Sequence, residues 1–138
     1  MMTTKMLRPY PEGLVPGEKF FTGPDVPKYP GRMVILTPAG GAGLTMEDVF
    51  DQPTWQAHVV GKQSRDGRVN ESADDAEELF ALVDAAIIGP TYPVTIGGIR
   101  VIRAQRFGAG PSPLNADQGG RAHYVGTYLF EHASGYGV

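Results

Sequence analysis

The chain has 138 residues, of which 41% are hydrophobic and 20% are charged, and this composition predicts one globular domain with a substantial core. It contains no cysteine, which excludes disulfides, thiol catalysis and cysteine-ligated metals, and no apolar run approaches the ~20 residues of a membrane helix. The net charge of −3 argues against a surface that coats nucleic acid.

The first 32 residues are interrupted throughout by proline and glycine, which leaves little room for regular structure. We therefore predict an extended N-terminal arm over residues 1–32, followed by a single domain over residues 33–138. Segments that stay disordered are usually poor in aromatic residues, whereas this arm contains Phe20, Phe21 and Tyr29. We expect the arm to become ordered against a neighbouring subunit.

Two strands are predicted next. Residues 33–37 form an apolar run that is rich in β-branched side chains and stops at Pro38. Residues 54–62 alternate between two faces, as a half-buried strand does. The intervening segment, residues 39–53, is predicted to be a long loop because glycine dominates its first part.

A glycine-rich loop after a strand is a common way to bind phosphate, but segment 39–53 lacks what that chemistry needs. A P-loop requires a lysine, and none occurs between Arg32 and Lys62. The glycine spacing does not match a dinucleotide loop either, and Glu47 and Asp48 would repel a phosphate. We expect instead that this loop contacts another subunit, through Gly40, Gly41, Gly43, Leu44, Met46 and Phe50.

One helix is predicted at about 72–88. Ser72 is placed to cap it, with Asp75 completing a capping box, and acidic residues crowd the first two turns, where the helix dipole favours negative charge. The pair Gly89–Pro90 ends it. Apolar residues at helical spacing form one face, which consists of Ala76, Leu79, Phe80, Val83, Ala86 and Ile87.

Residues 94–107 are predicted to form a hairpin that turns at Gly97–Gly98. A glycine- and proline-rich loop follows at 108–120, and the last strand is predicted at 121–131. Strands joined by hairpins together with one main helix predict an α+β fold. We expect a small, mostly antiparallel mixed sheet packed by that helix, with long glycine- and proline-rich loops.

The chemistry-bearing residues form no catalytic pattern. His58 and His123 lie in predicted strands that could be neighbours, but no metal-ligand spacing accompanies them, and no nucleophile motif occurs. Arg100, Arg103 and Arg106 recur every three residues along a strand, so their side chains alternate between faces instead of forming one basic stripe. We therefore expect no catalytic, cofactor-binding or metal site and no enzymatic activity.

The order of several short motifs resembles a known family. These are "RMVILTPAGGAG", "VFDQPTWQAHVVGK", an acidic-start helix ending in "VDAAI", "VTIGGIRVIRAQRFGAGPSPL" and "DQGGRAHYVGTYLF". The series resembles the minor capsid or tail-terminator proteins of long-tailed bacteriophages and spans residues 18–131. Many relatives begin with an amphipathic helix, whereas Pro9, Pro11 and Pro16 break residues 1–17 here. This departure also favours an extended arm.

The resemblance implies a structural virion protein, assembled in the host cytoplasm, that forms a hexameric ring. Such a ring caps the tail tube, joins the tail to the connector of the head and lets viral DNA pass through it. The implied partners are other copies of the chain, the tail tube protein and a head-completion or connector protein, with no membrane. The implied fold is an α/β sheet with flanking helices, consistent with the elements predicted above.

A cyclic ring needs two different patches on each subunit. We expect the arm and the 39–53 loop to form one patch, and sheet-edge residues near 100–107, including Arg103 and Arg106, to form the other. Two alternatives remain open from the sequence. One is another neck or head-completion protein of the phage, and the other is a small soluble ligand-binding domain that uses residues 39–53 as a lid.

Overall fold

The computed structural model describes the chain at residues 3–23, 27–45, 50–63, 69–114 and 121–133. Its helices and strands follow one another in the order α1 (Thr4–Leu7), α2 (Pro9–Leu14), β1 (Lys19–Thr22), β2 (Met33–Thr45), β3 (Phe50–Val60), α3 (Val69–Ile88), β4 (Val94–Ile96), β5 (Ile99–Leu114) and β6 (His123–Ala133).

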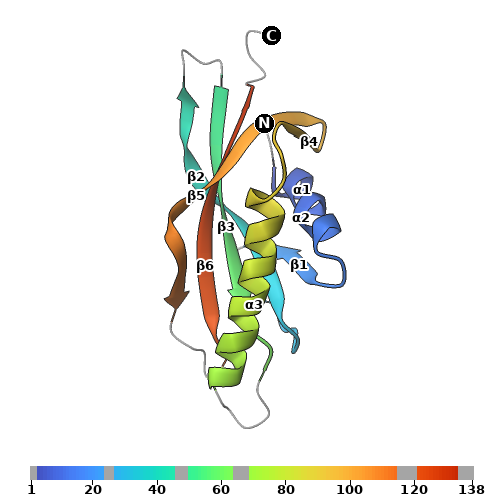
Figure 1. Ribbon diagram of the computed structural model, residues 1–138, viewed down its shortest axis with the longest axis vertical. Helices are drawn as coiled ribbons and strands as arrows, with labels where there is room; N and C mark the ends of the chain where they lie inside the picture. The colour runs from blue at the N-terminus through green and yellow to red at the C-terminus, as the bar shows by residue number, and fades with distance from the viewer. Residues whose placement is uncertain (1–2, 24–26, 46–49, 64–68, 115–120, 134–138) are drawn as a thin grey trace.

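The six strands form one mixed sheet in the order β1-β2-β3-β6-β5-β4, curled as a half-barrel. Strand β1 runs parallel to β2, and every other pair of neighbours is antiparallel. Helix α3 lies along one face of this sheet, and the short helices α1 and α2 lie beside its C-terminal half (Figure 1). The predicted α+β class, with a mostly antiparallel sheet and one main helix, is confirmed.

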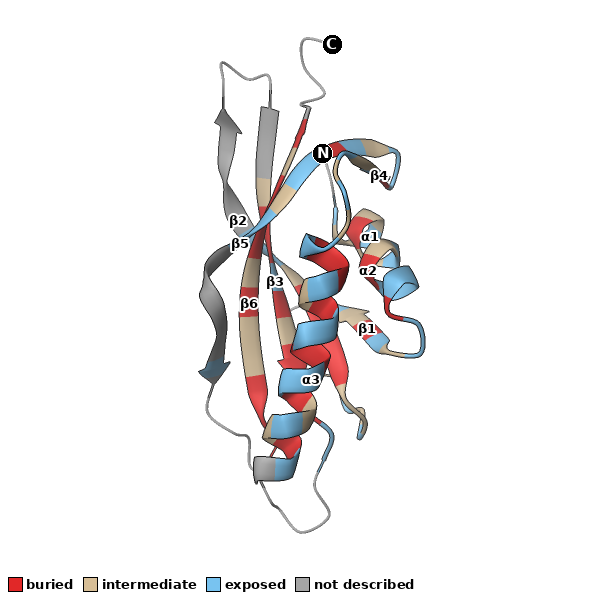
Figure 2. Ribbon diagram, viewed as in Figure 1, coloured by how far each residue is buried: buried red, intermediate tan, exposed pale blue. Residues whose placement is uncertain are grey.

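The core lies between the sheet and α3. On β2, Val34 and Leu36 point toward the helix and join the main core, whereas Met33 and Ile35 point to the opposite face and form a second, smaller cluster with Val60. Both sets are almost completely buried. Burial on both faces of the sheet explains the continuous apolar run that begins β2. Buried residues, drawn in red, cross the strands and follow one side of α3 (Figure 2).

Helix α3 buries the predicted apolar face but begins at Val69, earlier than expected. Ser72 therefore lies inside the helix and is not its N-cap. Its buried hydroxyl accepts a hydrogen bond from the backbone N–H of Ala122, at 2.9 Å. The helix packs closely on β6 at Gly126, where a Cβ would lie 2.5 Å from the Phe80 ring.

The N-terminal residues differ from the predicted extended arm, because residues 4–14 are helical. Thr3 caps α1, and Pro9 and Pro11 lie in the first turn of α2. The first four N–H groups of a helix have no partner within it, so a proline costs little at these positions. Leu7 is fully buried in the main core, so the arm folds against its own chain.

Where the structure describes them, the predicted loops at 39–53 and 108–120 are strands, and residues 46–49 and 115–120 lie outside the described residues. β2 continues to Thr45, β3 begins at Phe50, and β5 continues to Leu114. Register shifts interrupt the β2–β3 pairing on both sides of Gly41, and a further shift lies between Phe107 and Ser112 of β5. Such bulges let glycine and proline occur in long strands. The predicted turn at Gly97–Gly98 is confirmed, with φ of 58° and 81°.

Candidate assembly surface

The aromatic residues of the N-terminal segment lie against the protein's own sheet. Phe20 is 6% exposed and belongs to the main core, so its predicted role in a subunit interface is not compatible with its burial. Phe21 and Tyr29 are half-buried, with ring centroids 5.9 Å apart, and they pack on the second cluster formed by Met33, Ile35 and Val60. This part of the arm covers the sheet face opposite α3.

Arg121 holds this covering segment in place. Its guanidinium donates to three backbone carbonyl oxygens, those of Tyr29 at 2.7 Å, Gly31 at 2.6 Å and Gly61 at 3.0 Å. The residue is 8% exposed, and a planar guanidinium is the side chain that can donate in several directions at once from one buried position. Arg121 thus joins the segment before β2, the end of β3 and the start of β6.

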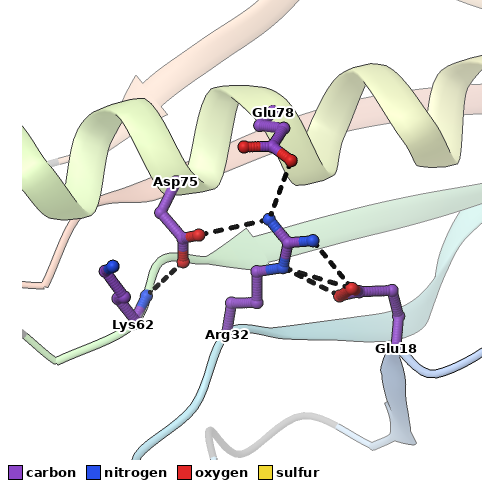
Figure 3. Close-up of polar contacts among 5 residues, drawn as sticks. All are labelled: Glu18, Arg32, Lys62, Asp75 and Glu78. Carbon is purple, nitrogen blue, oxygen red and sulfur yellow. Dashed lines mark hydrogen bonds and ion pairs between the residues drawn. The ribbon is translucent and has the colours of Figure 1, made fainter.

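A group of charged residues around Arg32 connects the arm to α3. Arg32 donates to both carboxylate oxygens of Glu18, with a shortest distance of 2.8 Å, and to Asp75 at 3.1 Å, while Glu78 lies 3.6 Å away (Figure 3). Asp75 also accepts from the backbone N–H of Lys62 at 2.9 Å. Hydrogen bonding to Glu18 is the main cause that raises the pKa of Arg32 above its ordinary value, and burial opposes it. The cluster is internally paired, which gives it a structural role.

The predicted contact residues of segment 39–53 lie at one end of the sheet. Gly40, Gly41, Gly43 and Leu44 are in β2 and Phe50 is in β3, while Met46 lies outside the described residues. Gly41 pairs with Pro53 and Leu44 pairs with Asp51. These ends of β2 and β3 extend beyond the end of α3 (Figure 1). They therefore contribute no surface to the contact between α3 and the sheet.

The two arginines predicted for the second patch point to opposite faces of β5. Arg103 is 56% exposed and pairs with Glu131 of β6 at 2.8 Å, whereas Arg106 is 35% exposed and pairs with Asp84 of α3 at 2.7 Å. The predicted alternation is confirmed for Arg103 and Arg106, while a register shift between Val101 and Arg103 separates Arg100 from them. Exposed ion pairs contribute little to stability because water screens them.

The short edge strands β1 and β4 cover only part of their long neighbours, β2 and β5. β4 pairs with β5 only over Ile99–Val101, and β1 pairs with β2 only over Met33–Leu36. Over the described residues, the outer sides of β5 from Ile102 and of β2 from Thr37 have no strand partner. The sequence did not reveal these open edges, because the strand order depends on contacts between distant segments.

The predicted proximity of His58 and His123 is confirmed. Nε2 of His58 lies 2.8 Å from Nδ1 of His123, on the sheet face opposite α3. Burial is the main cause that lowers the pKa of His58 below 6.5, and the neighbouring His123 adds to the effect. Among the described residues, no group of three or more metal-ligating side chains is present, and no helix combines the length and apolar character required to cross a membrane.

The lowered pKa of His58 predicts that acid destabilises the fold. Between the folded pKa and 6.5, the unfolded chain binds more protons than the folded one, so stability is complete above pH 6.5 and falls as the pH decreases below it. We expect the melting temperature to drop between pH 7.5 and pH 5.5, and to drop less in His58→Gln. Calorimetry on both proteins at matched ionic strength measures this. An equal drop in the two proteins would contradict the assignment to His58.

A shallow apolar groove lies between α2 and α3. It encloses about 290 Å³ and is lined by Leu14, Val15, Leu82, Ala85, Ala86 and Pro90. Leu14 and Leu82 are 49% and 41% exposed. None of these six side chains is polar, so they offer an apolar surface without the convergent polar groups that orient a small ligand.

Comparisons with known proteins support the fold and leave the function open. No family model matches the sequence, and no curated protein is a significant match. A solved structure of a protein whose name carries no functional information resembles this chain with a TM-score of 0.54 at 16% sequence identity. The similarity covers 97% of this chain and 92% of that chain. At this identity, the likeness establishes a shared fold over nearly the whole chain.

Proposed function

We propose that this protein is the tail terminator of a long-tailed bacteriophage, a structural virion protein that forms a ring at the end of the tail tube. The observation that supports this best is the extension of β2 and β3 beyond α3, combined with open outer edges on β2 and β5. The extensions of β2 and β3 lie past α3, and the two open edges are on opposite sides of the sheet. The ordered motifs that resemble the family fall on the same strands.

In this function, the ring, a hexamer by analogy with the family, ends polymerisation of the tail tube and binds the connector of the head. Viral DNA passes through its centre without being held, and the net charge of −3 is compatible with such passage because strong positive charge would retain DNA. The partners are further copies of the chain, the tail tube protein and a head-completion or connector protein.

The assembly state tests this function. The purified protein is expected to form rings, alone or after addition of tail tubes, that are visible by negative-stain microscopy and have a matching mass by light scattering. A strictly monomeric protein at high concentration that also adds no ring to tail tubes would contradict the proposal. A map of the particle that places this chain in a different ring of the neck would instead identify it as a head-completion protein.

Deleting Gly40–Gly43 is expected to weaken ring formation and leave the monomer folded. The deletion shortens β2 beyond Leu36, the last core residue among the described side chains of that strand, so the contact of Val34 and Leu36 with α3 is retained. We expect the circular dichroism spectrum of the parent protein and a melting temperature within a few degrees of it. Light scattering of both proteins at equal concentration measures assembly. Normal rings from the deletion variant would argue against a role for this segment.

A further inference from the structure

We propose that the outer edge of β5 pairs with the outer edge of β2 from a second copy of the chain, so that the sheet continues from one subunit to the next. This inference rests on the proposed ring assembly and specifies how neighbouring subunits contact each other. The contact consists of main-chain hydrogen bonds between strands, a mode by which an open sheet edge recruits another strand.

The edge of β5 is suited to this contact over Ile102–Arg106. An uncovered edge strand presents unpaired N–H and C=O groups that favour pairing with another chain. Ile102, at the first uncovered position, is 37% exposed. Register shifts against β6 flank this stretch, between Val101 and Arg103 and between Phe107 and Ser112, and Pro111 and Pro113 lie beyond the second shift. Bulges and prolines interrupt pairing at a sheet edge. The open stretch is therefore short and defined.

The complementary edge is that of β2 beyond Leu36, where Pro38 and the register shifts on both sides of Gly41 divide it into short stretches. β1 ends its pairing with β2 at Leu36, and the Thr37 hydroxyl donates to the Gly23 carbonyl oxygen just after β1, at 3.1 Å. From Pro38 onward, this side of β2 has no strand partner within the described part of the chain. Pro38 fits an edge strand because its missing N–H can face outward without loss of a ladder hydrogen bond. Ala39 is exposed and lies in the part of β2 that β1 does not cover.

The topology favours a head-to-tail arrangement of subunits. β3 and β6 separate β2 from β5 in the sheet, so the two open edges face away from each other. One subunit can therefore pair its β5 with the β2 of the next, and the two surfaces in contact are different. Such a heterologous contact is the kind that closes into a ring when repeated.

The two strand segments differ in the charged residues that their sequences contain. Residues 99–114 contain Arg100, Arg103 and Arg106 and no acidic residue. Residues 33–61, which include β2 and β3, contain Glu47, Asp48 and Asp51 and no lysine or arginine. Since Arg103 and Arg106 are paired with Glu131 and Asp84 within the subunit, the cross-linking experiment below decides between the two contacts.

Cross-linking tests the contact directly, because the parent chain has no cysteine. Ala39→Cys on β2 and Gln105→Cys on β5 both replace exposed side chains, so the variants should fold. With a short bis-maleimide cross-linker, a mixture of the two single variants is expected to give a covalent dimer, and the double variant a ladder of higher multimers. Ile102→Cys replaces Gln105→Cys in a second experiment, so that a contact with a different alignment of β5 against β2 is also detected.

A control variant on α3 and the pattern of cross-links distinguish the possible subunit contacts. Ala81→Cys, exposed on α3, is expected to give no dimer with Ala39→Cys. Dimers from Gln105→Cys alone would show that two β5 edges pair, and would overturn the inference. Rings seen by light scattering without cross-links at either β5 position would overturn the inference and leave the proposed function standing. A monomer without cross-links would overturn both.

Discussion

Replacing Arg121 with alanine is expected to lower the free energy of unfolding by about 3 kcal/mol, since three buried or half-buried carbonyl groups would lose a charged donor. Without these hydrogen bonds, the segment around Tyr29 and Gly31 is no longer held against the apolar cluster that it covers. Urea denaturation monitored by circular dichroism measures the change. We expect Met33, Ile35 and Val60 to become more accessible in hydrogen exchange before the rest of the core.

Two matched variants control this prediction. Arg121→Lys retains the positive charge but lacks the planar fork of the guanidinium, so its effect should lie between those of the parent and of Arg121→Ala. Arg100→Ala removes an exposed arginine and is expected to change stability by no more than about 0.5 kcal/mol. If Arg121→Ala were as stable as Arg100→Ala, the carbonyl contacts would not hold the covering segment.

Replacing Gly61 with alanine is expected to cost about 3 kcal/mol, at the upper end of overpacking effects. A Cβ at this buried position would overlap the backbone carbonyl oxygen and the hydroxyl of Ser72. Because a helix backbone cannot move aside as the tip of a side chain can, the first turns of α3 would have to shift. The hydrogen bond from Ala122 to Ser72 would then weaken. Chemical denaturation of parent and variant measures the loss.

Gly13→Ala is the control for Gly61→Ala, because it adds the same methyl group in open space. No atom lies within 4 Å of a Cβ at Gly13, which is in helix α2. Alanine is a better helix former than glycine, so this variant is expected to be as stable as the parent or up to about 1 kcal/mol more stable. A similar loss in both variants would mean that contact with Ser72 is not the cause.

The folding of the N-terminal segment changes the assembly hypothesis. From the sequence, its aromatic residues were expected to bind a neighbouring subunit. In the structure, Phe20 is in the core, and Phe21 and Tyr29 cover the subunit's own sheet. Of the segments that the sequence predicted to contact another subunit, those that contain the open edges of β2 and β5 therefore remain. Both edges belong to segments for which the sequence had predicted contact, at residues 39–53 and near residues 100–107.

Local patterns in the sequence determined several features of this protein. The apolar face of α3 follows from 3–4 spacing, the turn at Gly97–Gly98 from the need for positive φ, and the approach of His58 to His123 from their places on strands. Each feature depends on the geometry of a single element or on a simple pairing of neighbours. Periodicity and turn chemistry report such geometry directly.

Only the tertiary structure decided the rest. The prolines of residues 4–14 suggested a broken chain, but they fall at helix positions where the missing N–H has no partner. Arg121 and Arg32 had no local signal, since their partners lie far away in the sequence. The open edges of β2 and β5 likewise depend on strand order, which long-range contacts set. A sequence read locally therefore identifies the elements and their buried faces, while the packing of distant segments decides which edges remain available to a partner.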